Sequence, residues 1–298
     1  MKKLGKQTIK FDVPPSIVSV ASIVGPKEAN GPLAQYFDQC LDDEFWGEKT
    51  WEKSESKIIK ETVNMAISKS GIASSDIEYC FAGDLLNQCI SSSFGLRELN
   101  IPFIGIFGAC STFVEGLSLG AVFTESCAQN VICAASSHFC SAEKQFRFPL
   151  ELGNQRPQTS QWTVTGAGSA ILSKTGNGPY ITHITSGKIV DMGIKDANNM
   201  GAAMAPAALD TLITHLRDTN RKPSYYDAII TGDLGHIGKE IVTELSETKG
   251  YNIKNIYNDC GVLIFDKETQ DTHSGGSGCA CCGSVFSGYV FNKLRNKE

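Results

Sequence analysis

Apolar residues recur at helical spacing across residues 51–70, where Ile59 and Val63 fall on the same face. The spacing predicts a helix, and Gly71 directly after it suits the left-handed conformation that ends many helices. Residues 76–85 then form a short apolar segment that finishes in the tripeptide Gly-Asp-Leu. This segment is typical of a buried strand that ends in a turn.

The same pair of elements returns in the second half of the chain. Pro206 is followed by apolar residues at helical spacing from Leu209 to Leu216, which predicts a helix with the proline in its first turn. Residues 226–234 form a second apolar strand, which again finishes in Gly-Asp-Leu. A helix, a strand and one tripeptide therefore recur together, which predicts an internal duplication.

Both copies continue in the same order: a helical segment, a strand, a turn that carries a cysteine, and a helix of small apolar residues. Further strands are expected at residues 130–135 and 166–172. The sequence thus predicts a duplicated α/β protein with parallel strands and two halves, residues 1–175 and 176–298. The later elements are expected at 102–107, 108–112 and 113–123 in the first copy, and at 236–248, 253–257, 261–266, 275–279 and 280–294 in the second.

Composition and charge narrow the class of protein. The chain has 298 residues, of which 41% are hydrophobic and 20% charged, as in ordinary soluble domains. The formal net charge is −5 and the basic residues are scattered, which argues against nucleic acid as a partner. No stretch approaches the roughly 20 continuous apolar residues that cross a bilayer, and no signal peptide follows Met1. We therefore expect any membrane association to be peripheral.

The eleven cysteines do not form a recognisable framework for disulfides or metal. A chain of this size does not need disulfides to stabilise its core. The dense cluster from Cys279 to Cys282 lacks a partner pair at zinc spacing. We expect free thiols in a reducing compartment, no metal site and no cofactor.

Cys110 is the strongest candidate for chemistry. It lies on the turn between the strand at 102–107 and the buried helix at 113–123. The start of a helix offers unpaired N–H groups and the positive end of the helix dipole, so we expect a lowered pKa for this thiol. Asp84 and Asp233, at the two strand ends, are expected to cap turns, although Asp233 is close in sequence to His236.

The sequence from Ile106 to Leu117 resembles the nucleophile turn of thiolases and ketoacyl synthases, most closely the type III synthases. The resemblance implies a thiolase-like fold with αβαβα layers and a histidine that faces the cysteine, for which His236 is in place. It also implies an asparagine or second histidine on the glycine-rich turn, where Ser277 stands instead. His273, which precedes that turn, is the alternative donor. The catalytic set is therefore incomplete.

Two longer strings, residues 136–149 and 187–206, resemble the stage V sporulation AD proteins of endospore-forming bacteria. The resemblance implies a non-enzymatic protein that binds dipicolinic acid, with or without calcium, for uptake into the forespore and release in germination. It also implies partners from the same operon at the spore inner membrane. The thiolase-like family further implies a homodimer formed across the strand at 102–107.

Dipicolinate is a flat aromatic dianion, so its site needs donors for two carboxylates and an apolar slot for the ring. The candidate ligand-binding residues are Cys110, His138, Arg147, His236 and Ser277. Arg147 lies between two phenylalanines, so its guanidinium could bind a carboxylate while an aromatic ring stacks on the ligand. An ion pair at the surface or at a dimer interface explains Arg147 equally well. Two other functions stay open: an acyltransferase that uses Cys110 and His236, and a scaffold of a membrane complex without a small ligand.

Overall fold

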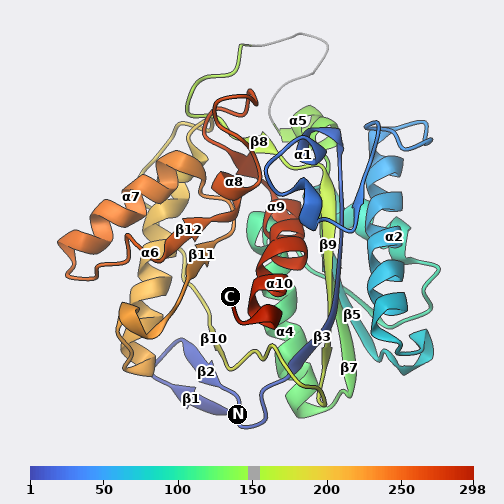
Figure 1. Ribbon diagram of the computed structural model, residues 1–298, viewed down its shortest axis with the longest axis horizontal. Helices are drawn as coiled ribbons and strands as arrows, with labels where there is room; N and C mark the ends of the chain where they lie inside the picture. Colours follow the sequence, from blue (N-terminus) through green and yellow to red (C-terminus); the bar gives the residue numbers. More distant parts are fainter. Residues whose placement is uncertain (147–154) are drawn as a thin grey trace.

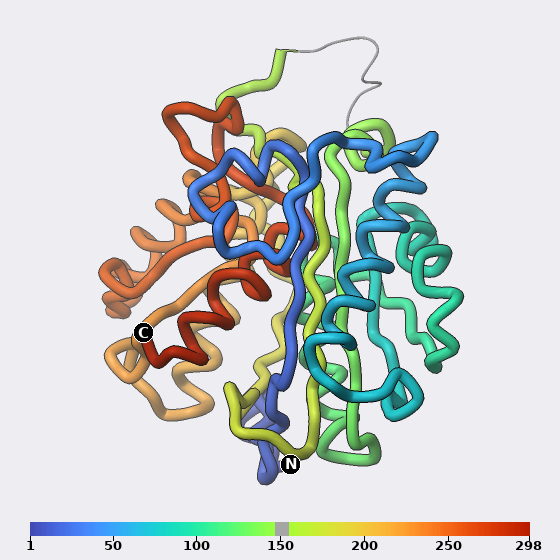
Figure 2. The backbone as a smooth tube through the Cα atoms, turned by 45° about the vertical axis from the view of Figure 1, so that its right-hand side comes forward, coloured from blue at the N-terminus to red at the C-terminus, as the bar shows by residue number. Residues whose placement is uncertain are grey.

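The computed structural model describes residues 1–146 and 155–298. Its largest element is a six-stranded sheet in the order β4-β3-β9-β7-β5-β6. Figure 2 shows β3, β9 and β7 side by side along the length of the molecule. The strands are β3 (Ser16–Val24), β4 (Gln39–Cys40), β5 (Tyr79–Gly83), β6 (Phe103–Gly105), β7 (Asn130–Ser137) and β9 (Gly166–Ser173).

The direction of the central strands differs from the sequence prediction. β5 is parallel to β6 and β7, as expected, but β9 is antiparallel to both β3 and β7. All eight residues of β9 are buried, so the sequence shows no alternation that would reveal its neighbours. β3 was not predicted at all.

Helices cover both faces of this sheet, and a second, smaller sheet follows. Ile132 packs in the cluster under α2 (Trp51–Ser70), whereas Val131 and Cys133 pack in the cluster under α4 (Thr112–Ser126), because neighbouring strand residues point to opposite faces. Figure 1 shows the layers from right to left: α2, the large sheet, α4 with α9, the β11–β12 pair, and α6 with α7. The remaining bounds are α3 (Ile90–Leu96), α6 (Met200–Thr219), α7 (Gly235–Thr248), α9 (Cys279–Val285), β11 (Ile229–Thr231) and β12 (Tyr257–Asp259).

The order of the elements agrees with the predicted duplication. α2, β5, α3, β6, a turn and α4 are followed later by α6, β11, α7, β12, a turn and α9. β11 and β12 are parallel, like β5 and β6. α2 has the predicted bounds, and Gly71 ends it at φ +69°.

Three boundaries in the second half differ from prediction. α6 begins at Met200, where Asn199 Oδ1 accepts from the Ala202 N–H at 3.2 Å, so Pro206 lies inside the helix. Residues 261–266 begin in the short helix α8 (Cys260–Leu263) rather than in a strand. The final helix has three parts, α9, a π-helical turn (Phe286–Val290) and α10 (Phe291–Asn296).

Several smaller elements complete the molecule. β1 (Lys2–Leu4), β2 (Thr8–Lys10) and β10 (His183–Thr185) form a three-stranded sheet, and β8 (Trp162–Thr163) pairs with β13 (Gly276–Ser277). No helix within residues 1–146 and 155–298 combines the length and apolarity needed to cross a membrane. The short helices are α1 (Pro26–Ala29), α5 (Phe139–Phe146), and the 3-10 turns η1 (Ala34–Tyr36), η2 (Ser74–Asp76), η3 (Asn87–Cys89), η4 (Ala109–Ser111) and η6 (Pro223–Tyr225).

Candidate functional site

Cys110 lies on the short turn η4, between β6 and α4. The turn is held from within, because the Thr112 hydroxyl donates to the Ala109 carbonyl at 2.7 Å and accepts from the Gly108 N–H at 3.1 Å. Ala109 has a φ of +49°, which non-glycine residues seldom adopt. These hydrogen bonds fix the backbone of the turn. Cys110 itself is half-buried, so the turn reaches the surface.

The carboxylate of Asp233 faces the Cys110 thiol. Asp233 follows β11 by two residues and is buried. The Gly278 N–H donates to its Oδ2 at 2.8 Å, Ser277 Oγ lies 3.5 Å from the same oxygen, and the Cys110 thiol also donates to the carboxylate. Asp233, Ser277 and Gly278 belong to the second half of the chain, so the two halves meet at this cysteine.

Burial and a neighbouring charge make the Cys110 thiol difficult to ionise. Burial, and then the negative charge of Asp233, raise the pKa of Cys110 well above its usual value, while Gly278 and Ser277 act in the opposite direction. The lowered thiol pKa predicted from the helix start is therefore wrong. The pKa of Asp233 is itself raised to about 6, chiefly by burial. At neutral pH the site holds a neutral thiol beside a carboxylate.

His236 lies in the first turn of α7, three residues beyond Asp233. Its backbone N–H donates to the Ser274 carbonyl at 2.7 Å. Burial lowers the pKa of its ring, and the charged groups that influence the ring are Lys267, Lys239 and Glu240. Asp233, which was expected to cap a turn, therefore contacts the Cys110 thiol, and the facing role of His236 stays a prediction. The signal was present in the sequence, because Asp233 belongs to the repeated Gly-Asp-Leu tripeptide.

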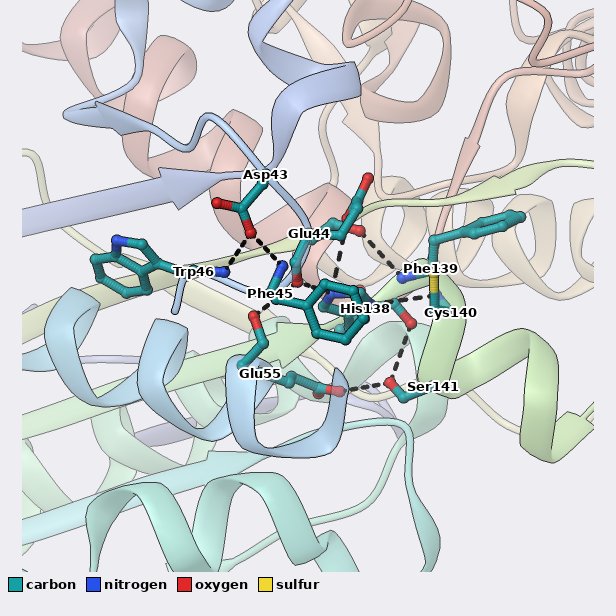
Figure 3. Close-up of polar contacts among 12 residues, drawn as sticks. Asp43, Glu44, Phe45, Trp46, Glu55, His138, Phe139, Cys140 and Ser141 are labelled. Atoms are coloured by element: carbon teal, nitrogen blue, oxygen red, sulfur yellow. Dashed lines mark hydrogen bonds and ion pairs between the residues drawn. The ribbon is translucent and has the colours of Figure 1, made fainter. Parts of the chain in front are cut away.

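His138 connects a buried strand end to an N-terminal loop (Figure 3). The Cys140 N–H donates to its Nδ1 at 3.2 Å, so the ring proton is on Nε2, which donates to the Glu44 carbonyl at 2.8 Å. The side chain is fully buried, and burial lowers its pKa. Both ring nitrogens of the neutral His138 are therefore satisfied by the protein itself.

The other predicted residues divide into those at the site and those elsewhere. Ser277 lies at the site, beside Asp233. His273 is paired with Asp271 at 2.6 Å and with the Pro157 carbonyl at 2.8 Å. Arg147 lies outside the described residues. The ligand-binding role of these side chains stays a prediction.

A second group of buried carboxyls lies near Cys279 on α9. Glu55 accepts from the Ser136 hydroxyl at 3.0 Å and the Ser141 hydroxyl at 2.9 Å, the latter drawn in Figure 3. Asp84 accepts from the Ser92 N–H at 2.7 Å, near the start of α3, in the capping role expected for it. Burial raises the pKa of both carboxyls, which indicates that a proton is retained in this pair near neutral pH.

The thiols and acids of the described residues do not form a metal site. All eleven cysteines lie in the described part of the chain, and all are free thiols. No group of three or more His, Cys, Asp and Glu side chains there is arranged to hold a metal ion.

The fold is that of the thiolase-like ketosynthases. The structure of a variant of OleA from Xanthomonas campestris is similar with a TM-score of 0.60 and 13% identity, covering 99% of this chain and 92% of that chain. The 3-oxoacyl-[acyl-carrier-protein] synthase III from Aquifex aeolicus VF5 is similar with a TM-score of 0.57 and 10% identity, covering 95% and 91% of the two chains. The predicted thiolase-like class is thus confirmed.

The family is shown by sequence. The family described as Stage V sporulation protein AD (SpoVAD) matches residues 5–298. The protein of that name from Bacillus subtilis (strain 168) is 42% identical over 296 residues, which cover 99% of this chain and 87% of that protein. The chain belongs to the stage V sporulation protein AD family, as its sequence strings predicted.

Proposed function

We propose that this sporulation protein is a non-catalytic binding protein for dipicolinate, with its site at the Cys110 turn. It would serve uptake of dipicolinate into the forespore and its release in germination, at the spore inner membrane with other proteins of the same operon. The observation that supports this proposal is the Asp233 carboxylate beside Cys110. Acyl transfer to a cysteine requires the thiolate, and a neighbouring carboxylate disfavours that form.

The ligand chemistry fits the polar groups around the turn with one condition. The Ser277 hydroxyl and the Gly278 N–H, which contact the Asp233 carboxylate, lie at the site, and His236 starts the adjacent helix. A dianion beside the negative Asp233, however, is repelled. Calcium bound by the carboxylates of dipicolinate reduces this repulsion, because it neutralises the charge of the ligand. We therefore expect dipicolinate to bind with calcium, and Asp233 to contribute to the calcium dependence.

Isothermal titration calorimetry tests this proposal. We expect calcium to strengthen dipicolinate binding to the natural protein by about tenfold or more, as one favourable charge interaction at a part-buried site would. Asp233→Asn keeps the shape and removes the charge, so this variant should bind with little dependence on calcium. Isophthalate, which has the same two carboxylates without the ring nitrogen, is the control ligand. Absence of dipicolinate binding at millimolar concentration, with and without calcium, would contradict the proposal.

The acyltransferase alternative has a distinct signature. Incubation with acetyl-CoA or malonyl-CoA would add an acyl group to the intact mass of the natural protein, and the adduct would be lost in Cys110→Ser. Such an adduct would favour the enzyme over the binding protein. A scaffold without a small ligand would give neither a heat of binding with dipicolinate nor an acyl adduct in the intact mass.

A further inference from the structure

Gln161 is a buried amide that joins two turns of the site. It directly precedes β8 and is 2% exposed. Its Nε2 donates to the Asp233 carbonyl at 2.7 Å and to the Gly276 carbonyl at 2.7 Å. Both hydrogens of one NH2 group are thus used, each on a different turn.

The two turns are those that face Cys110. The first carries Asp233, and the second carries Gly276 directly before Ser277. Both come from the second half of the chain, whereas Gln161 and Cys110 come from the first half. Gln161 is therefore placed to fix the distance between the two halves at the cysteine.

The local packing leaves little freedom for these turns to find another arrangement. Gly235 has a φ of +67°, and a Cβ atom there would lie 2.9 Å from Gln161 Nε2 and 2.2 Å from the Ser274 carbonyl oxygen. The β8–β13 pairing adds a bond from the Trp162 N–H to the Gly275 carbonyl at 2.8 Å. The amide thus sits at the junction of three closely packed backbone segments.

We propose that Gln161 is a positioning residue, which holds the Asp233 and Ser277 turns against Cys110. Without its amide, the two buried carbonyls lose a donor, and such groups must move or admit water. Either change takes the Asp233 carboxylate away from the sulfur. The proposal concerns the site of the proposed function, but its evidence and its test need no ligand.

The pH dependence of Cys110 alkylation tests this role. Iodoacetamide reacts with the thiolate, so the rate at Cys110, followed by peptide mass spectrometry, reports the thiol pKa. The groups around the sulfur are Asp233, Ser277 and Gly278, with Cys279 and Cys281 on α9. In Gln161→Leu we expect the alkylation midpoint to fall by at least about one pH unit, an approximately tenfold faster reaction below the midpoint.

Two comparisons separate positioning from general loss of structure. Thr62→Val removes a buried hydrogen bond in α2, from Thr62 Oγ1 to the Ile58 carbonyl, and should leave the midpoint unchanged. Gln161→Leu added to Asp233→Asn should cause no further shift, because the charge is already gone. If Gln161→Leu does not fold, Gln161→Asn, with a shorter amide, should give a smaller shift in the same direction.

Either of two results would overturn the proposal: an unchanged midpoint in the folded Gln161 variants, or an equal shift in Thr62→Val. A shift of the midpoint together with no dipicolinate binding by the natural protein would support the positioning role and contradict only the proposed function.

Discussion

The Asp233 carboxyl beside the Cys110 thiol is the main residue-scale feature of the candidate site. Burial and then the negative charge of Asp233 favour the protonated form of this thiol and so raise its pKa. The sequence predicted the position of Cys110 and the presence of Ser277 at the same site. It did not predict that Asp233 contacts the thiol, because that contact depends on how the two halves of the chain pack against each other.

Glu28 provides a prediction about pH and stability at this scale. It is fully buried, its Oε1 accepts from the Thr165 N–H at 3.0 Å, and its Oε2 has no hydrogen-bond partner among the described residues. Burial raises its pKa to about 8. The folded chain therefore keeps a proton that the unfolded chain releases above its ordinary pKa near 4.5.

The direction of the pH effect on stability follows from the number of protons that the folded and unfolded states bind. Between about pH 5 and 8 the folded state binds more protons at Glu28, so the free energy of unfolding falls as pH rises, by up to about 1.4 kcal/mol per pH unit. Glu28→Gln removes this contribution. The free energy of unfolding of this variant, relative to that of the natural protein, should therefore be higher at pH 8 than at pH 5. Urea unfolding at both pH values measures the difference. The exposed Glu268→Gln is the control, and equal slopes in all three proteins would refute the prediction.

At the scale of elements, the sequence predicted the helices and strands that are determined by residues close together in the chain. The apolar spacing and Gly71 predicted α2, and the strand β5 and helix α7 followed from the repeat. The start of α6 was missed because Pro206 was taken as a first-turn residue, whereas Asn199 caps the helix earlier. The direction of β9 was not predictable in this way, since long-range pairing determines it.

The contact between β9 and α9 gives a prediction at this scale. A Cβ atom on Gly168 would lie 2.1 Å from the backbone carbonyl of Gly283. Backbone atoms in a packed core cannot yield by rotation, so Gly168→Ala should lower the free energy of unfolding by about 3 kcal/mol, in the range of overpacked cores. Urea unfolding monitored by circular dichroism measures this loss.

Gly116 is the matched control, because it is also a buried glycine that packs on the large sheet. A Cβ atom there would first meet the flexible end of Ile106 at 3.3 Å. Alanine also favours a helix interior by about 1 kcal/mol over glycine, so Gly116→Ala should be nearly neutral. Equal losses in both variants would show that the close approach at Gly168 is not the cause.

At the scale of the whole molecule, the edge of the large sheet stays open. β6 is the last strand of the sheet and, within the part of the chain that the structure describes, is paired only with β5. Phe103 at its start and Phe107 two residues beyond its end are 38% and 53% exposed, and Val114 at the start of α4 is 49% exposed. An unpaired edge with aromatic side chains favours pairing with another strand. The strand at 102–107 was expected to be buried, whereas in a single chain one of its edges is unpaired and its aromatic side chains are partly exposed.

We propose that a second copy of the chain covers this edge, with β6 paired to its symmetry mate, as the thiolase-like resemblance implied. A twofold axis through β6 would pair each strand with itself in antiparallel order and bury Phe103 and Phe107. Phe107 is three residues before Cys110, so the interface would border the candidate site.

Sedimentation equilibrium should give about twice the mass of 32.1 kDa, and Phe107→Glu should give the monomer because it places a charge in the interface. Tyr225→Glu changes an aromatic residue that is 62% exposed on η6 and should leave the dimer intact. A natural protein that stays monomeric at tens of micromolar would refute the dimer. A dimer that survives Phe107→Glu would place the interface on another surface, and the open edge of β6 would then need a different partner.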